Sequence, residues 1–296
     1  NALASGTTGD FNVAVGGASL GSINTGNCNT AIGACAMNTN TSGANNTAVG
    51  KDSLLANTTG VNNVAVGKDS LKTNTTASGN TAVGESALEV TTTGCCNSAL
   101  GNGALQANTT GDNNTAVGQA ALAFNTTADN NTAVGRLAMF CNTTGEQNTA
   151  SGINSLSSNT TGGINVANGA YVLCANTTGN DNTAIGGYSM KENTTGSTNV
   201  AMGRSALRCN TTASNNTAVG NAALCLNTTG CENVAMGAKA LDANTTGHYN
   251  TAVGYDSLSS NTTASYNTAV GCNALKVNTT GATNTAVGSN SLDANT

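Results

Sequence analysis

Asparagine is the residue type whose spacing most clearly suggests chemistry in this chain. The triplet Asn-Thr-Thr recurs at multiples of seventeen residues, and Asn40 begins the related triplet Asn-Thr-Ser. Asparagine in N-x-T or N-x-S is the acceptor for N-linked glycans. The candidate acceptors are Asn40, Asn57, Asn74, Asn108, Asn125, Asn142, Asn159, Asn176, Asn193, Asn210, Asn227, Asn244, Asn261 and Asn278.

A structural role explains the same triplets without any modification. Asparagine can cap a turn, and threonine can extend a column of side chains along a stack. Glycans on neighbouring strands about 4.8 Å apart would also crowd one another. Four further acceptors, of the form Asn-Asn-Thr, begin at Asn45, Asn113, Asn130 and Asn215. Both interpretations, a glycosylated surface and an unmodified turn, stay open from the sequence.

The ten cysteines suggest less chemistry than their number implies. No C-x-x-C pair occurs, and the single His248 cannot complete a Cys/His zinc site alone, so we predict no metal. Cys95 and Cys96 are contiguous, Cys209 and Cys225 lie in neighbouring repeats, and Cys225 and Cys231 flank one turn. An extracellular protein could form disulfides at some of these positions, whereas small buried cysteines would need none. We predict no particular connectivity.

Catalysis requires unlike groups that converge in a pocket, such as an acid and a base or a nucleophile and its partner. The carboxylates, for example Asp52, Asp69, Glu85 and Asp256, occupy variable positions of a repeat, which is typical of solvated residues. His248 has the same character, and no G-x-G pattern precedes a helix. We therefore predict a protein that is not an enzyme and uses no cofactor.

All these residues are positioned by one repeat that never changes length. Its opening asparagine recurs every seventeen residues from Asn12 to Asn284. Surface loops of globular folds accept insertions at little cost, so a fixed spacing indicates coils of a solenoid stacked on one another. We predict a single continuous array of about 17 coils over residues 1–296, with partial repeats at both ends. We expect a fragment of a longer protein, with any receptor-binding tip outside it.

Each repeat has a regular internal pattern, numbered here from position 0 at the opening asparagine. Position 2 is Ala, position 4 is Gly, position 3 is mostly aliphatic and position 8 is Leu or Met. The run N-(T/V)-A-V-G predicts a short strand that ends at the glycine. Alternation places positions 1 and 3, such as Thr47 and Val49, on one face, and positions 0, 2 and 4 on the other.

We expect the aliphatic face to fill the coil and the small face to approach a second backbone or subunit. The predicted core residues are Val49, Leu54, Val66, Leu71, Val117 and Leu122. Such a core is thin, so main-chain bonds between coils and stacked asparagines must add stability. An asparagine amide can donate to one rung and accept from the next. The predicted stacking ladder includes Asn46, Asn63, Asn114, Asn131, Asn216 and Asn250.

Composition excludes several partners. The chain has no Pro, no Trp, 8% charged residues and a net charge of −5, and its nine Lys and Arg residues are scattered. That distribution offers no basic stripe for nucleic acid. No apolar run reaches the roughly 18 residues of a membrane span. We therefore expect neither nucleic acid nor a membrane span in this segment.

The run N-T-A-V-G followed by A-L, as in Asn114–Gly118 with Ala121 and Leu122, resembles the head repeats of trimeric autotransporter adhesins. It is also similar to repetitive tail-fibre shafts of bacteria and phages. The resemblance covers essentially the whole chain. It implies an all-β fold, a left-handed β-roll, and a homotrimer in which three rolls pack around a common axis. It further implies an extracellular, cell-surface or virion location.

The functional expectation is a non-catalytic structural or adhesive extracellular fibre shaft built from β-solenoid coils of seventeen residues. The alternative is an N-glycosylated extracellular filament. Binding to ice or another crystal surface is a third hypothesis, because threonines at positions 12 and 13 form regular columns. Two consecutive residues of a strand point to opposite faces, which argues against this third hypothesis.

Overall fold

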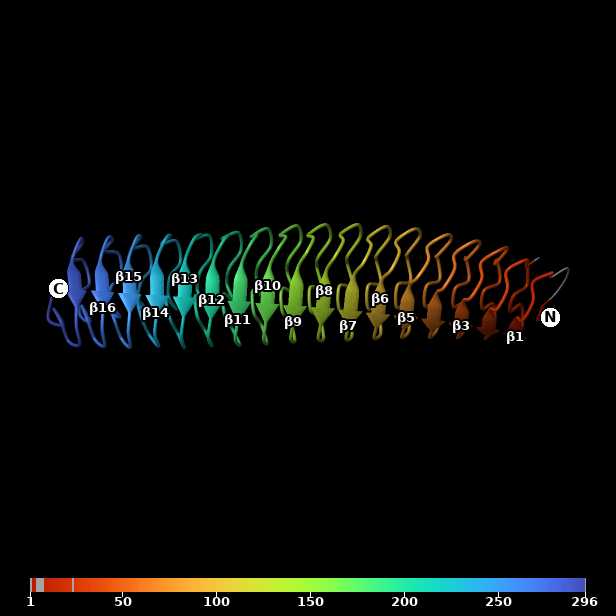
Figure 1. Ribbon diagram of the computed structural model, residues 1–296, viewed down its shortest axis with the longest axis horizontal. Helices are drawn as coiled ribbons and strands as arrows, with labels where there is room; N and C mark the ends of the chain where they lie inside the picture. The colour runs from red at the N-terminus through yellow and green to blue at the C-terminus, as the bar shows by residue number, and fades with distance from the viewer. Residues whose placement is uncertain (1, 4–7, 23, 296) are drawn as a thin grey trace. The chain divides into compact units, whose positions relative to one another are not determined.

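The computed structural model describes residues 2–3, 8–22 and 24–295, and it contains only short strands, turns and bends in these ranges (Figure 1). Residues group into two compact units, Asn1–Gln147 and Asn148–Thr296. The boundary falls between two repeats, and the seventeen-residue period of the sequence continues across it. No helix long and apolar enough to cross a membrane is found in the described ranges.

Every strand spans positions 1 to 3 of its repeat. The strands of unit 1 are β1 (Val13–Val15), β2 (Thr30–Ile32), β3 (Thr47–Val49), β4 (Val64–Val66), β5 (Thr81–Val83), β6 (Ser98–Leu100), β7 (Thr115–Val117) and β8 (Thr132–Val134). The strands of unit 2 are β9 (Thr149–Ser151), β10 (Val166–Asn168), β11 (Thr183–Ile185), β12 (Val200–Met202), β13 (Thr217–Val219), β14 (Val234–Met236), β15 (Thr251–Val253), β16 (Thr268–Val270) and β17 (Thr285–Val287).

Within each unit, consecutive strands pair in parallel with a constant offset of one repeat. Ala48 of β3 lies opposite Ala65 of β4, and Ala184 of β11 lies opposite Ala201 of β12. Because each strand pairs with the same positions of the next repeat, each repeat is one coil of a parallel β-solenoid. The predicted all-β solenoid with seventeen-residue coils is confirmed within both units.

The glycine at position 4 ends each strand in a conformation that other residues rarely adopt. Gly118 has φ +131°, and a Cβ placed on it would lie 2.7 Å from the carbonyl carbon and oxygen of Gly135 in the next coil. Only glycine combines this backbone conformation with so close an approach between coils. The invariant glycine therefore sets both the bend and the stacking distance.

The interior face of the strand is the opposite of the one predicted. Ala48 and Asn46, at positions 2 and 0, are fully buried inside the coil. The predicted core valines Val49, Val66 and Val117 are only partly buried and point outward, so their assignment to the core was wrong. Ala and Asn occupy the interior because the coil is narrow. A branched side chain at position 2 would need space that the buried residues at positions 7 and 8 already occupy.

The predicted leucines at position 8 do lie in the core. Leu54, Leu71 and Leu122 are fully buried, and each has a left-handed backbone with φ between 48° and 51°. That conformation is unfavourable for leucine, by about 1–3 kcal/mol. Hydrogen bonds hold the turn, since the Leu54 amide donates to the Ser70 carbonyl at 3.0 Å and the Leu54 carbonyl accepts from the Asn57 amide at 3.2 Å. Burial and these bonds together offset the strain.

Candidate interaction surfaces

The asparagines at position 0 close each coil and link it to its neighbours. The Asn63 main-chain amide donates to Asn46 Oδ1 at 2.9 Å, and Asn46 Nδ2 donates to the Gly60 carbonyl of its own coil at 2.8 Å. The six predicted ladder residues are all buried. In this column the side-chain oxygen accepts mainly from main-chain N–H groups of the next coil. Each asparagine side chain therefore links the main chains of two coils, and bonds between two side-chain amides are less prominent.

The stronger amide ladder stands at position 11, which holds the candidate glycan acceptors. Asn57 Nδ2 donates to Asn40 Oδ1 at 2.8 Å and to the Gly60 carbonyl at 3.1 Å, while Asn74 Nδ2 donates to Asn57 Oδ1 at 2.9 Å. Each amide thus donates to the preceding coil, accepts from the following one and caps its own turn. Such a chain of buried polar groups is stable only because each member has partners.

These contacts favour the structural interpretation of position 11 over the glycan-acceptor interpretation. A glycan would replace one amide hydrogen on Nδ2, yet both hydrogens of Asn57 point to acceptors and the residue is fully buried. All fourteen candidate acceptors are buried in the same way, with at most 1% of the residue exposed. A sugar on the folded coil would break this hydrogen-bonded column, so we interpret these asparagines as structural.

The four Asn-Asn-Thr acceptors differ, because Asn45, Asn113, Asn130 and Asn215 are exposed at position 16. Their backbones have φ between 58° and 62°, which asparagine tolerates better than most residues. When the chain is secreted from a host that attaches N-glycans, we expect modification only at these four. Peptide mass mapping after enzymatic deglycosylation measures it, with Asn113→Gln as the control that loses one site. A glycan on a position 11 asparagine of folded protein would contradict the expectation.

Position 15 carries a further ladder that sequence reasoning missed. Its side chain accepts a hydrogen bond from the position 15 amide of the preceding coil. Asp112 accepts from the Cys95 amide at 2.6 Å, and His248 Nδ1 accepts from the Cys231 amide at 2.9 Å. The signal in the sequence was the frequency of Asn, Asp and Ser at this otherwise variable position. His248 is therefore one acceptor in a column of acceptors.

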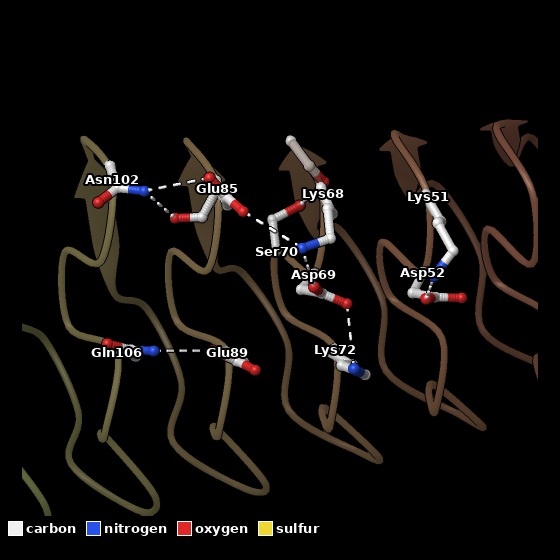
Figure 2. A network of polar contacts seen from close by, with 11 residues as sticks. Lys51, Asp52, Lys68, Asp69, Ser70, Lys72, Glu85, Glu89, Asn102 and Gln106 are labelled. Carbon is white, nitrogen blue, oxygen red and sulfur yellow. Dashed lines mark hydrogen bonds and ion pairs between the residues drawn. The ribbon is translucent and has the colours of Figure 1, made fainter.

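Charged side chains of unit 1 pair along the stack on the loop that follows each strand, at positions 5, 6 and 9 (Figure 2). Lys68 Nζ lies 3.2 Å from Glu85 Oε1 in the next coil and 3.2 Å from Asp69 Oδ2, and Lys72 Nζ lies 3.0 Å from Asp69 Oδ1. Burial raises the pKa of the Asp69 carboxyl, but the Lys72 and Lys68 ammonium groups outweigh it and hold that pKa below its usual value.

Polar side chains on the same loop also form contacts between the coils that follow Lys68. Asn102 Nδ2 lies 3.5 Å from Glu85 Oε2, and Gln106 Nε2 donates to Glu89 Oε2 at 2.9 Å (Figure 2). Lys51 pairs with Asp52, and in unit 2 Lys276 pairs with Asp256 at 3.2 Å. In both ion pairs the lysine is exposed to solvent and the aspartate is largely covered. Ion pairs at a protein surface contribute about 0–1 kcal/mol each. Each carboxylate that the sequence analysis named as solvated therefore has a lysine partner in its own coil or in a neighbouring one.

All ten cysteines carry free thiols. Cys209 and Cys225 are neighbours through the main chain, because the Cys209 amide donates to the Cys225 carbonyl at 3.0 Å. Burial is the main reason that the pKa of the Cys225 thiol is raised, with a smaller contribution from Cys209. Among the described residues, no three His, Cys, Asp or Glu side chains gather as a metal site would require.

The outer sheet face consists of positions 1 and 3 of the strands. Position 1 holds Thr, Val or Ser, and position 3 is aliphatic in every strand except β9 and β10, where Ser151 and Asn168 stand. No charged residue occurs at either position of the described strands. Several position 3 side chains are well exposed, for example Leu100 at 51% and Met202 at 42%. This face is a continuous uncharged stripe within each unit.

The chain is therefore a repeat protein of the parallel β-solenoid class. No protein-family model matches it, and the search of curated proteins found no match.

Proposed function

We propose that the chain is the shaft of an extracellular fibre in which three copies pack around a common axis through their outer sheet faces. The observation that carries the proposal is the exposed aliphatic stripe at position 3. Soluble monomers rarely leave such a stripe in water, and stripes of this kind mark association sites. In the proposed assembly the coils are left-handed, as the resemblance to trimeric adhesin repeats implies.

The proposed interface differs from the one expected from the sequence. Positions 0, 2 and 4 had been assigned to the subunit contact, but Asn46 and Ala48 are fully buried in their own coil. The outward side chains at positions 1 and 3, such as Thr47 and Val49, take their place. Because the repeat is constant, a contact formed by one coil is available to each coil of the stripe.

The energy of such an interface grows with the number of coils. Burying the exposed half of one Val or Leu side chain contributes about 1 kcal/mol, so the eight strands of unit 1 offer several kcal/mol in one contact. An uncharged face also carries no desolvation cost for ions. The same repetition that stacks the coils thus favours side-by-side assembly of copies.

The mass of the chain in solution tests the proposal. Sedimentation equilibrium should give three times 28.8 kDa, and the double substitution Val49→Lys with Val117→Lys should give the single-chain mass while far-ultraviolet circular dichroism stays that of a β protein. Two lysines per chain would be buried without partners, and burying an unpaired charge costs several kcal/mol.

A matched control is Val90→Lys, because Val90 has 39% exposure in the same unit but lies on a loop at position 10. It should remain trimeric. A single-chain mass for the unmodified protein would end the proposal. Equal dissociation by the control would show that the outer sheet face is not the interface.

Two observations bear on the alternative functions. The glycosylated-filament hypothesis is supported only by the four exposed acceptors at position 16. Four glycans would cover a small part of the surface of a shaft. The ice-binding hypothesis loses the position 12 column, because Thr58 Oγ1 donates to the Thr75 carbonyl at 2.9 Å and Thr109 Oγ1 donates to the Thr126 carbonyl at 2.9 Å. Hydroxyls bonded along the stack have given their hydrogen to the main chain, so they can only accept from water.

A further inference from the structure

Unit 2 contains a recess in which basic and aromatic side chains meet. Its volume is about 290 Å³. The lining residues are Tyr188, Lys191, Glu192, Arg204, Ser205 and Arg208. Three of the nine Lys and Arg residues of the whole chain therefore fall in two successive coils, those that begin at Asn182 and Asn199.

The main chain fixes the spacing of these side chains. The Tyr188 amide donates to the Ala170 carbonyl at 3.0 Å, and the Ser205 amide donates to the Gly187 carbonyl at 3.1 Å. The Glu192 amide donates to the Arg208 carbonyl at 3.0 Å, which ties the far side of the loop to the next coil. Hydrogen bonds between successive coils therefore fix the main chain around the recess, and the long side chains of Lys191, Arg204 and Arg208 line it.

An aromatic platform stands beside the basic groups. The rings of Tyr171 and Tyr188 stack with centroids 5.6 Å apart and planes 1° apart. Tyr188 keeps 39% of its surface exposed, so one ring of the stack is open to a ligand in the recess. A flat ring of this kind packs against the C–H face of a sugar and offers a phenolic hydroxyl at its edge.

The charges around the recess do not cancel. Lys191 Nζ lies 3.1 Å from Glu192 Oε1. No ion pair of Arg204 or Arg208 is found in the described part of the chain, although the Arg208 side chain also contacts the Cys209 thiol. Three cations and one carboxylate leave a formal charge of +2 on a chain whose net charge is −5. Guanidinium groups present several donors in one plane, which suits bidentate contact with a carboxylate or sulfate.

We propose that this recess binds an acidic sugar, namely a pyranose that carries a carboxylate or a sulfate. The anionic group lies between Arg204 and Arg208, and the ring packs on Tyr188. Glu192 and Ser205 accept hydrogen bonds from sugar hydroxyls. The site is contained in one chain and does not depend on how copies associate, so it stands apart from the proposed fibre.

A nucleic acid is the competing ligand, because stacking rings and arginines also bind single strands. Two features favour the sugar. The carboxylate of Glu192 lines the recess and accepts from hydroxyl groups, which a saccharide offers on every ring and the backbone of single-stranded DNA does not. The basic cluster also ends after two coils, and a long polyanion would pass over acidic or neutral coils beyond it.

Fluorescence anisotropy with labelled tetrasaccharides tests the proposal on the full chain. The probes are a tetrasaccharide containing glucuronic acid, a sulfated tetrasaccharide, a neutral tetrasaccharide of equal length and a single-stranded oligonucleotide. At least one acidic saccharide should bind, with a Kd that rises with salt, and the neutral one should not bind measurably. Substituting Arg204→Gln together with Arg208→Gln should weaken binding at least about tenfold.

Two variants serve as matched controls. Lys239→Gln removes an exposed cation at another coil of unit 2, and Tyr255→Ala removes a tyrosine with 52% exposure outside the recess. Both should bind like the unmodified chain, whereas Tyr188→Ala should bind more weakly. Circular dichroism checks that each variant keeps its β structure. Tighter binding of the oligonucleotide, equal loss in the controls, or no saccharide binding at millimolar concentration would each overturn the proposal.

Discussion

Replacing Gly118 by alanine should destabilise unit 1 by about 3–5 kcal/mol and open the stack around β7. The backbone at Gly118 has φ +131°, which a residue with a Cβ rarely adopts. The new methyl would also lie 2.7 Å from the carbonyl carbon and oxygen of Gly135. Those atoms belong to main chain, so the contact cannot be relieved by a rotamer change.

The neighbouring hydrogen bonds explain why relaxation is costly. The Gly118 amide donates to the Leu100 carbonyl at 2.8 Å, and the Gly135 amide donates to the Val117 carbonyl at 2.8 Å. Moving either glycine aside to admit a methyl group would lengthen bonds on both sides of the coil. In a repeat array each coil is stabilised by its neighbours, so the loss should be greatest in the adjacent coils.

Hydrogen exchange followed by mass spectrometry measures this local effect, and urea unfolding measures the total. The control is Gly187→Ala, since Gly187 follows the bend and a Cβ there would meet only the Ala170 carbonyl oxygen at 3.9 Å. That variant should match or slightly exceed the unmodified stability. Protection of residues 101–135 equal to that of the unmodified chain in Gly118→Ala would contradict the expectation.

The sequence was sufficient for the period, the strand position and the core role of Leu54, because each depends on local pattern. It was not sufficient to decide which strand face turns inward. Val49 is more apolar than Ala48, so hydrophobicity alone placed it inside. The interior is instead decided by space, since the buried Leu and Met column at position 8 leaves room only for small side chains at position 2. Side-chain size, which a hydropathy pattern does not measure, therefore determines which strand face is buried.

The role of Asn57 stayed open in the sequence for a related reason. An N-x-T triplet has the same letters whether the asparagine is exposed or buried, and only three-dimensional contacts distinguish the two. The better signal was that position 11 is almost always asparagine, whereas the half-buried position 15 and the exposed position 16 vary. A constant polar residue in a repeat indicates a buried hydrogen-bonded column, because solvent places no such demand on side-chain identity.

Replacing Asn125 by aspartate should destabilise unit 1 by about 3–5 kcal/mol at pH 7, although the side chain keeps its size. Asn125 Nδ2 donates to Asn108 Oδ1 at 2.9 Å and to the Ala128 carbonyl at 3.0 Å. A carboxylate cannot donate, so it would face two oxygens across hydrogen-bond distances inside a fully buried column. Only the contact in which Asn142 Nδ2 donates to the residue would survive, at 2.9 Å in the unmodified chain.

The effect of Asn125→Asp should depend on pH in a defined direction. Burial and the two facing oxygens raise the pKa of the new carboxyl in the folded chain above about 3.9, its value when unfolded. The folded variant then binds the proton more tightly, so the penalty is complete above the folded pKa and shrinks as pH falls toward the unfolded value. A protonated acid also regains one donor.

Urea unfolding at pH 7 and pH 4.5 measures this dependence against two controls. Asn125→Ala also loses both donors but adds no titrating group, so its penalty should be the same at the two pH values. Asn130→Asp changes an exposed asparagine of the next turn and should stay within about 0.5 kcal/mol of the unmodified chain. If Asn125→Asp were as stable as Asn130→Asp at pH 7, the amide ladder at position 11 would not be a source of stability. The coils would then be held by main-chain bonds, by the asparagine column at position 0 and by the buried Leu and Met column at position 8.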